Sequence, residues 1–323
     1  MKVVSLFSGA GGLDLGFIKA GHKVIWANDN YSDATETYKI NIGNHIVCED
    51  IRNIKSKDIP NHDILIGGFP CQGFSVANTS RNESDSRNKL YLEFKRILKD
   101  KQPSFFVAEN VKGILSLGKG EVFKMIISDF EKVGYKITHK VLNAANFGVP
   151  QKRQRVIIFG RRKDLMIDLK HPPETHSKDP NLFDNLPKWV TIGEALEDIA
   201  DPDSPNNLKN HTYSKFKLKF NGYIGNRRID PNKPAPTVTA RGDSKGGVVV
   251  LHHPNNKRRM SVRELAIVQS FPIDYEFFGS NSSAYRQIGN AVPPKMAFEI
   301  AKVFTQISSK LNNASAKKTV CQL

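Results

Sequence analysis

Short apolar runs alternate with amphipathic stretches through the first half of this chain, and that alternation restricts the fold more than any other feature. The apolar runs have the length and composition of buried strands, and the stretches between them include segments with helical periodicity. Strands that alternate with helices predict an open α/β sheet. The runs interpreted as strands lie at residues 3–7, 23–27, 64–66, 103–108 and 156–160, and predicted helices lie at 32–40, 90–99 and 121–133.

The alternation stops near Asp164, and a different composition follows. Residues 164–235 contain eight prolines and basic-aromatic pieces such as KFKLKF at 215–220. This composition predicts a smaller, loop-rich domain that presents cations to phosphates. Its expected core is segment 236–242 with a strand at 247–251, followed by a capped helix at 261–269. We therefore expect three parts: a large domain (1–170 plus 285–311), a small domain (171–284) and a polar tail (312–323).

A glycine turn, SGAGGLDLGF at residues 8–17, joins the first predicted strand to a helix. Such a turn brings backbone N–H groups and the positive end of a helix to a ligand. It departs from the dinucleotide pattern G-x-G-x-x-G, because Asp14 stands where the third glycine belongs. An acid at that position favours a ligand with a positive centre over one with a pyrophosphate.

Two more acids follow the next predicted strands. Asp29 comes about 20 residues after the glycine turn, where an acid accepts hydrogen bonds from ribose hydroxyls; a helix N-cap is the alternative role. Asp50 is placed to bind an exocyclic amine, and Ile51 to pack on the base. Together these features describe an adenosine pocket without a pyrophosphate site, which S-adenosylmethionine fits.

The segment GGFPCQGFS at residues 67–75 follows the apolar run 64–66. It therefore places Cys71 at the carboxyl end of a buried strand, where open α/β sheets have their sites. A buried, inert cysteine is the alternative, which Pro-Cys-Gln alone does not exclude. The loop 73–89 that follows, whose polar stretch is 76–89, is interpreted as a lid rather than a linker, because it lies beside a candidate nucleophile.

Charged residues also occur at the ends of two later predicted strands. The run 103–108 delivers Glu109 to the same sheet edge as Cys71, and a carboxylate there is costly to bury unless it is used or paired. In QKRQR at residues 151–155, alternation places Arg153 and Arg155 on one face. Two arginines on one face beside an apolar strand indicate a buried anchoring role.

Composition limits the partners. The formal net charge is +16, divided as +7 in residues 1–160 and +9 in the remainder, which favours a polyanionic partner; general solubility is the alternative. The cysteines, Cys48, Cys71 and Cys321, form no C-x-x-C pair, which argues for a reducing compartment and against structural zinc. No signal peptide is evident, and no apolar run approaches the roughly 20 residues that span a bilayer. The expectation is a soluble intracellular protein without metal or membrane.

With these pieces, the chain resembles the DNA (cytosine-5)-methyltransferases of bacterial restriction-modification systems. The resemblance implies a Rossmann-like, S-adenosylmethionine-dependent large domain, closed by the last helix, and a small target-recognition domain across a DNA cleft. It covers almost the whole chain. The matching segments, in the family's order, are FSGAGG (7–12), Asp29, DI (50–51), PCQ (70–72), ENV (109–111), QKRQR (151–155), RELA (263–266) and QIGNAVP (287–293).

The resemblance also implies roles for individual residues. Cys71 would add to carbon 6 of cytosine, Glu109 would protonate N3, and Arg155 would orient both, with Arg153, Gln72 and Ser75 in the same catalytic set. The implied cofactor residues are Phe7, Gly9, Gly11, Gly12, Leu13, Asp29, Asp50, Ile51, Pro70, Leu90, Asn290 and Val292. The implied DNA contacts are Arg87, Arg227, Arg228, Thr237, Val238 and Arg241.

The function expected is transfer of a methyl group from S-adenosylmethionine to carbon 5 of cytosine in a short duplex DNA sequence, with base flipping and S-adenosylhomocysteine as product. An RNA methyltransferase with the same chemistry is the nearest alternative; a nicotinamide oxidoreductase and a catalytically idle DNA-binding module are further ones. We expect a cytoplasmic, DNA-associated monomer, with a cognate restriction endonuclease acting on the same site. The target sequence is not encoded in any feature of the chain that we identify.

Overall fold

The computed structural model describes residues 1–70, 90–180, 185–215, 217–221, 226–240 and 250–320, the last ten by backbone alone. Seven strands form one sheet in the order β3-β2-β1-β4-β5-β7-β6. Neighbouring strands are parallel except at β7, which runs antiparallel to both β5 and β6. The strands are β1 (Lys2–Leu6), β2 (Lys23–Asp29), β3 (Ile46–Cys48), β4 (Ile64–Gly67), β5 (Phe105–Val111), β6 (Tyr135–Asn143) and β7 (Gln154–Arg162).

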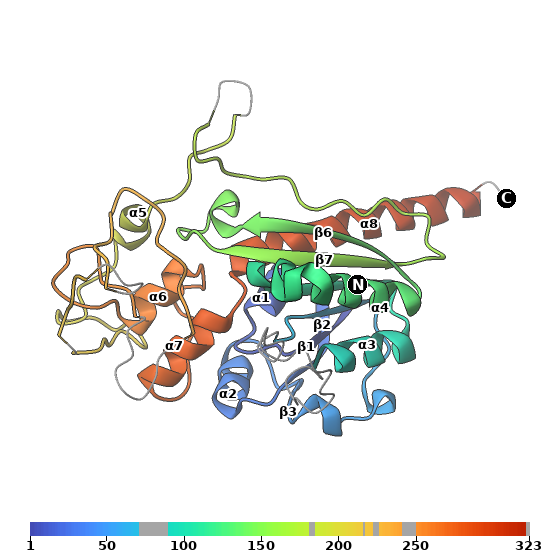
Figure 1. The fold of residues 1–323 in the computed structure, drawn as a ribbon, viewed down its shortest axis with the longest axis horizontal. Helices are drawn as coiled ribbons and strands as arrows, with labels where there is room; N and C mark the ends of the chain where they lie inside the picture. Colours follow the sequence, from blue (N-terminus) through green and yellow to red (C-terminus); the bar gives the residue numbers. More distant parts are fainter. Residues whose placement is uncertain (71–89, 181–184, 216, 222–225, 241–249, 321–323) are drawn as a thin grey trace.

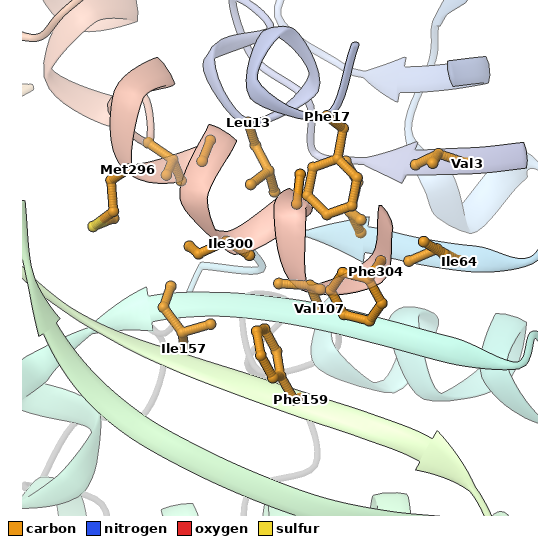
Figure 2. Packing of buried hydrophobic residues seen from close by; sticks show 14 of the residues in the cluster. Val3, Leu13, Phe17, Ile64, Val107, Ile157, Phe159, Met296, Ile300 and Phe304 are labelled. Carbon is orange, nitrogen blue, oxygen red and sulfur yellow. The ribbon is translucent and has the colours of Figure 1, made fainter. Parts of the chain in front are cut away.

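The alternation of side chains along each strand supplies two hydrophobic cores, one on each face of the sheet. On the first face, Val3, Val107 and Ile157 pack against α1 (Gly12–Lys19) and α8 (Pro294–Val320), as Figure 2 shows. Phe304 of α8 lies between the rings of Phe105 and Phe159. The last helix therefore covers the sheet formed by the first half of the chain, as predicted.

The opposite face takes the residues one step along each strand. Phe106 and Ile158 pack there against α3 (Leu90–Lys101) and α4 (Glu121–Lys132). Both helices have strongly one-sided apolar faces, which is why they lie flat on the sheet. A further helix, α2 (Ser32–Asn41), follows β2 near the edge strand β3.

The remaining helices, α5 (Ile192–Leu196), α6 (Val262–Val268) and α7 (Asn281–Asn290), gather at one end of the molecule, on the left in Figure 1. They share a separate hydrophobic cluster. Helix α6 has the predicted capping box, in which Ser261 and Glu264 each accept a backbone N–H of the other. The predicted strand at 247–251 lies mostly outside the described residues; its last two residues, Val250 and Leu251, are buried in this cluster without forming a strand.

One prediction about the end of the chain needs correction. The large domain does not end at residue 311 before a separate polar tail, because α8 continues as helix to Val320. The physical reason is that the sequence beyond Leu311, NNASAKKTV, contains neither the glycine nor the proline that usually ends a helix.

Candidate active site

A cavity of about 410 Å³ lies at the carboxyl ends of β1, β2, β4 and β5. The parallel arrangement of these strands brings their ends to one sheet edge, and α7 closes the other side. Gly11 is absent from the wall; it is instead the residue before α1, with a φ of 79°. The predicted residues that line the cavity are Phe7, Gly9, Gly12, Leu13, Asp29, Asp50, Ile51, Pro70, Leu90, Glu109, Arg153, Arg155, Asn290 and Val292.

A carboxylate and a guanidinium meet at one end of this cavity. The Nε of Arg155 lies 2.7 Å from Oε1 of Glu109, and each side chain is only 11% exposed. The register of β5 with β7 explains the contact, because Arg155 pairs with Val111, whose side chain points to the same face as Glu109. The Arg155 N–H is not directed at Oε1, so this buried oxygen accepts no hydrogen bond from the described residues. The carboxylate and the guanidinium therefore form a buried ion pair on the wall of the cavity.

The chain that leads into Cys71 lies directly against this carboxylate. A Cβ on Gly68 would come within 2.9 Å of Oε2 of Glu109, so a larger residue there would require the carboxylate to shift. Asn110 is buried and donates from Nδ2 to the carbonyl of Phe69 at 2.9 Å. The side chain next to Glu109 thus fixes the backbone immediately before Pro70. Our sequence reasoning gave Asn110 no role of its own, although its place beside Glu109 in the ENV segment was a signal.

Asp29 lies at the other end of the cavity, where β2 ends. Its two carboxylate oxygens accept the backbone N–H groups of Gly9 and Tyr31, each at 2.8 Å. Burial raises the pKa of Asp29 despite these bonds. The carboxylate therefore ties the glycine turn to the end of β2 and keeps further lone pairs for a ligand.

Asp14 also borders the cavity, but its oxygens already have partners. The hydroxyls of Ser5 and Tyr38 donate to them, each at 2.9 Å. Burial raises the pKa of Asp14 to about 6, against the lowering effect of both hydroxyls. The carboxyl group is thus held by the protein itself rather than directed at a ligand.

Asp50 is likewise engaged by the chain. The guanidinium of Arg52 binds both of its oxygens, with distances of 2.9 Å from Nε and 2.5 Å from a terminal nitrogen. This bond lowers the pKa of Asp50. The pair is partly exposed, so an incoming amine would compete with a solvent-accessible guanidinium. Ile51, the first residue of the short 3-10 helix η1 (Ile51–Asn53), is buried beside it.

The predicted DNA contacts differ in their surroundings. Arg227 and Arg228 are exposed, and the guanidinium of Arg228 lies over the ring of Phe220. Thr237 donates from Oγ1 to the carbonyl of Lys152 at 2.7 Å. The side chain of Val238 is 1% exposed, so it packs in the core and is not available as a side-chain contact to DNA.

Several predicted residues lie outside the described part of the chain: Cys71, Gln72, Ser75, Arg87 and Arg241, together with the predicted lid at 73–89. Within the described ranges, no group of three or more His, Cys, Asp or Glu side chains is arranged to hold a metal ion. No helix among them is long and apolar enough to cross a membrane.

Comparison with known families identifies the family of this chain. The chain belongs to the C-5 cytosine-specific DNA methylases, whose family model matches residues 1–306. Among curated relatives, it is 41% identical to the Type II methyltransferase M.NgoFVII of Neisseria gonorrhoeae, covering 95% of this chain and 87% of that protein. It is 40% identical to M.FnuDI of Fusobacterium nucleatum, covering 94% and 93%.

Solved structures show the same architecture. A structure described as a DNA modification methyltransferase encoded within an E. coli prophage superimposes with a TM-score of 0.76 at 27% identity, covering 96% of this chain and 99% of that one. The methyltransferase EhMeth of Entamoeba histolytica, at 18% identity and a TM-score of 0.70, shares the fold.

The protein is therefore a DNA (cytosine-5)-methyltransferase with relatives in Type II restriction-modification systems. Its fold is that of the Rossmann-like, S-adenosylmethionine-dependent methyltransferases. Because the matching family is one of DNA methylases, DNA is favoured over RNA as the substrate.

The residues of the cavity suit the cofactor of this family. Asp29 keeps acceptor lone pairs at the end of β2, and Gly9 has open space where a side chain would stand. Phe7 directly follows β1 and has a φ of 54°, a left-handed backbone conformation that is uncommon for a residue other than glycine. Ile51, Pro70 and Leu90 add apolar surface for a flat base. A hydroxylated sugar and an aromatic base match this combination of groups.

Proposed function

We propose that the methyl transfer proceeds through a covalent adduct between Cys71 and the target cytosine. Carbon 5 of cytosine is a weak nucleophile, and addition of a thiolate to carbon 6 makes it enamine-like. The observation that carries the proposal is the buried ion pair of Glu109 and Arg155 on the wall of the cavity. The pairing of Gly67 with Ala108 supports it, because Glu109 and the chain toward Cys71 leave the sheet at the same edge.

Cys71, Glu109 and Arg155 have different roles in this mechanism. As the Cys71 sulfur bonds to carbon 6, electrons move toward N3, and Glu109 in its acid form gives N3 a proton. Arg155 orients the carboxyl group and stabilises the carboxylate that remains. When bound, S-adenosylmethionine supplies a methyl group on a sulfonium centre, which carbon 5 takes up to leave S-adenosylhomocysteine. A base then takes the carbon-5 proton, the Cys71 thiolate leaves from carbon 6, and N3 returns its proton to Glu109, which restores the ring and the acid.

We further propose that the cavity-lining cofactor residues, with Gly11 shaping the turn behind them, hold S-adenosylmethionine. Asp29 would bind the ribose, Asp50 the adenine amine after displacement of Arg52, and Phe7 and Ile51 the base. Asn290 and Val292 would complete the methionine side. The ends of β1 and β2 support this arrangement, because they present acceptors and apolar surface together.

The recognition part of the proposal concerns residues 171–284. Inside a duplex, stacking hides cytosine from both the Cys71 thiolate and the methyl donor. The base must therefore be flipped out, at a cost of about a few kcal/mol. Residues 73–89 would close over it, with Gln72 and Ser75 beside the nucleotide. The exposed Arg227 and Arg228, with Arg87, Thr237 and Arg241, would contact the duplex. We propose that the protein is a cytoplasmic monomer and that a restriction endonuclease recognises the same DNA sequence.

A crosslinking experiment tests the covalent step. A duplex with 5-fluorocytosine at the methylated position, mixed with the enzyme and S-adenosylmethionine, should give a complex that survives denaturing electrophoresis. Fluorine at carbon 5 cannot leave as a proton does, so the adduct accumulates. Cys71→Ser should abolish the complex and methyl transfer while duplex binding persists. Equal methyl transfer by Cys71→Ser would exclude the mechanism.

A further inference from the structure

The segment just before β7 is paired with the segment that leads into the DNA-contacting part of the small domain. Gln151 forms a parallel bridge with Ala235, and backbone bonds of 2.8 Å join Ala235 N to Pro150 O and Lys152 N to Ala235 O. The chain 150–153 and the chain 235–238 thus run side by side, although more than 80 residues separate them. A displacement of segment 235–238 should therefore also displace segment 150–153.

Buried side chains hold the Val238 peptide from both sides. Oε1 of Gln151 accepts its N–H at 2.9 Å, and a terminal nitrogen of Arg153 donates to its carbonyl at 2.8 Å. Gln151 and Arg153 are 0% and 1% exposed. Val238 is followed within three residues by Arg241, a predicted DNA contact.

The second terminal nitrogen of Arg153 reaches a different element. It donates to the carbonyl of Gly289, near the end of α7, at 2.8 Å. Gln269 donates to the carbonyls of Ile288 and Ala291 at 2.9 and 2.8 Å, and its side chain also accepts from Gln151. The next residues, Asn290 and Val292, line the cavity.

The contact between these two elements is also made backbone to backbone. A Cβ on Gly289 would lie 2.3 Å from the carbonyl carbon of Thr239 and 2.4 Å from the nitrogen of Ala240. Only glycine allows α7 to approach the 238–240 segment this closely. Displacement of that segment would therefore press directly on α7.

Burying a guanidinium without a carboxylate in direct contact is costly, and two charge-assisted bonds to carbonyls offset part of that cost. The planar fork of arginine spans two acceptors at fixed separation, which a lysine ammonium does not reproduce. Arg155, two residues further along the chain at the start of β7, forms the ion pair with Glu109. Arg153 therefore stands where the DNA-contacting segment, the cofactor wall and the catalytic strand meet.

We propose that Arg153, supported by Gln151, is a positioning residue for sequence specificity: it transmits the placement of the 238–240 segment on DNA to Gly289 and to the Glu109–Arg155 pair. This proposal rests on the proposed role of residues 171–284 in reading DNA. A duplex with one wrong base pair would leave the segment displaced and the catalytic pair misaligned. Without the guanidinium fork, correct and incorrect sites would differ less in rate.

The test compares methylation patterns. Plasmid DNA treated with wild type or Arg153→Lys is bisulfite-sequenced at matched total methylation, and methylated sites are divided into the wild-type target sequence and sequences differing from it by one base pair. A wrong base pair ordinarily weakens binding by a factor of roughly ten or more. We expect Arg153→Lys to reduce the preference for the wild-type target by roughly tenfold. The control is Arg161→Lys. Arg161 lies on β7 outside the cavity and also donates to a backbone carbonyl, that of Leu165, so this variant should keep the wild-type preference.

The outcomes separate the possibilities. A proportional fall at all sites, with preference unchanged, would show a structural role only and overturn the proposal. Gln151→Met, which loses the Val238 N–H bond but keeps Arg153, should shift the preference in the same direction. If neither variant folds, amide hydrogen exchange of the wild type decides: target duplex, compared with unrelated duplex, should slow exchange at residues 288–291, and equal exchange would refute the coupling. Absence of cytosine methylation by the wild type would instead contradict the proposed function.

Discussion

The sheet half of this molecule (1–170 and 285–311) and the loop-rich half (171–284), called the recognition half after its proposed role, satisfy their buried backbone groups in different ways. In the sheet, the strand ladders pair nearly all of them, and the side chains are free to form two apolar cores. In the recognition half, buried arginines donate to the backbone instead: Arg259 to Val250, Arg263 to Lys209. The loop-rich half thus uses long, charged side chains for many of the bonds that the strands make through their ladders.

A mutation in the sheet core tests most directly whether apolar packing stabilises the sheet half. Phe106 is fully buried and packs against the rings of Phe94, Phe130 and Tyr135. Phe106→Ala should lower the free energy of unfolding by about 5 kcal/mol, because it leaves a large cavity among rigid rings. Urea unfolding followed by circular dichroism measures the change. Met125→Ala, at a half-exposed position on α4, is the control; a comparable loss there would show that burial does not set the cost.

The matching change in the recognition half removes a charge. Arg258 binds both oxygens of the buried Glu264 at 2.8 Å and also contacts Asp201. Arg258→Met should destabilise by about 4 kcal/mol, because Glu264 is left buried without its cation. The loss should concentrate in the recognition half.

The two tryptophans can locate that loss. Trp26 lies on β2 and Trp189 lies just before α5, so single-tryptophan variants report the two halves separately. After Arg258→Met, unfolding seen by Trp189 should shift to lower urea more than unfolding seen by Trp26. Lys257→Met, at the exposed neighbouring position, should shift neither. Equal shifts at both tryptophans after Arg258→Met would mean that the halves unfold as one unit.

The same contrast explains which features of the structure could be predicted from the sequence. The strands of the first half and the capping box at Ser261 could be predicted, because apolar alternation and capping are local patterns. Glu109 was found as an acid at the end of a buried strand. The reversed direction of β7 and the links from Gln151 and Gln269 to distant carbonyls were not found, since bonds between residues far apart in sequence leave no local pattern.

One buried carboxyl group in the sheet half departs from the apolar rule and makes stability depend on pH. The pKa of Asp14 is raised from 3.8 to about 6 by burial, so the folded state binds the proton more tightly than the unfolded state does. Its contribution to stability is therefore greatest below pH 4 and is lost as pH rises through 6. Relative to Asp14→Asn, the wild type should lose about 3 kcal/mol between pH 4 and pH 7.

Urea midpoints of both proteins across that pH range measure the difference. Asp58→Asn, which replaces an exposed carboxylate, provides the control for the general effect of removing one negative charge. A wild-type minus Asp14→Asn difference that stays constant with pH would show that Asp14 is ionised equally in both states.

The smallest effect concerns local backbone satisfaction in the recognition half. The Ser261 hydroxyl accepts the N–H of Glu264 at 3.1 Å, while Glu264 accepts the N–H of Ser261 at 2.7 Å. Ser261→Ala should cost about 1 kcal/mol, the usual value of an N-cap, and Ser261→Thr should recover most of it. Because His211 also contacts the Ser261 hydroxyl, an alanine effect well above this value, unrelieved by threonine, would assign the residue to the buried polar network of this half rather than to the helix end. In either case, the irregular half depends on a side chain for a bond that the strands make through their backbone alone.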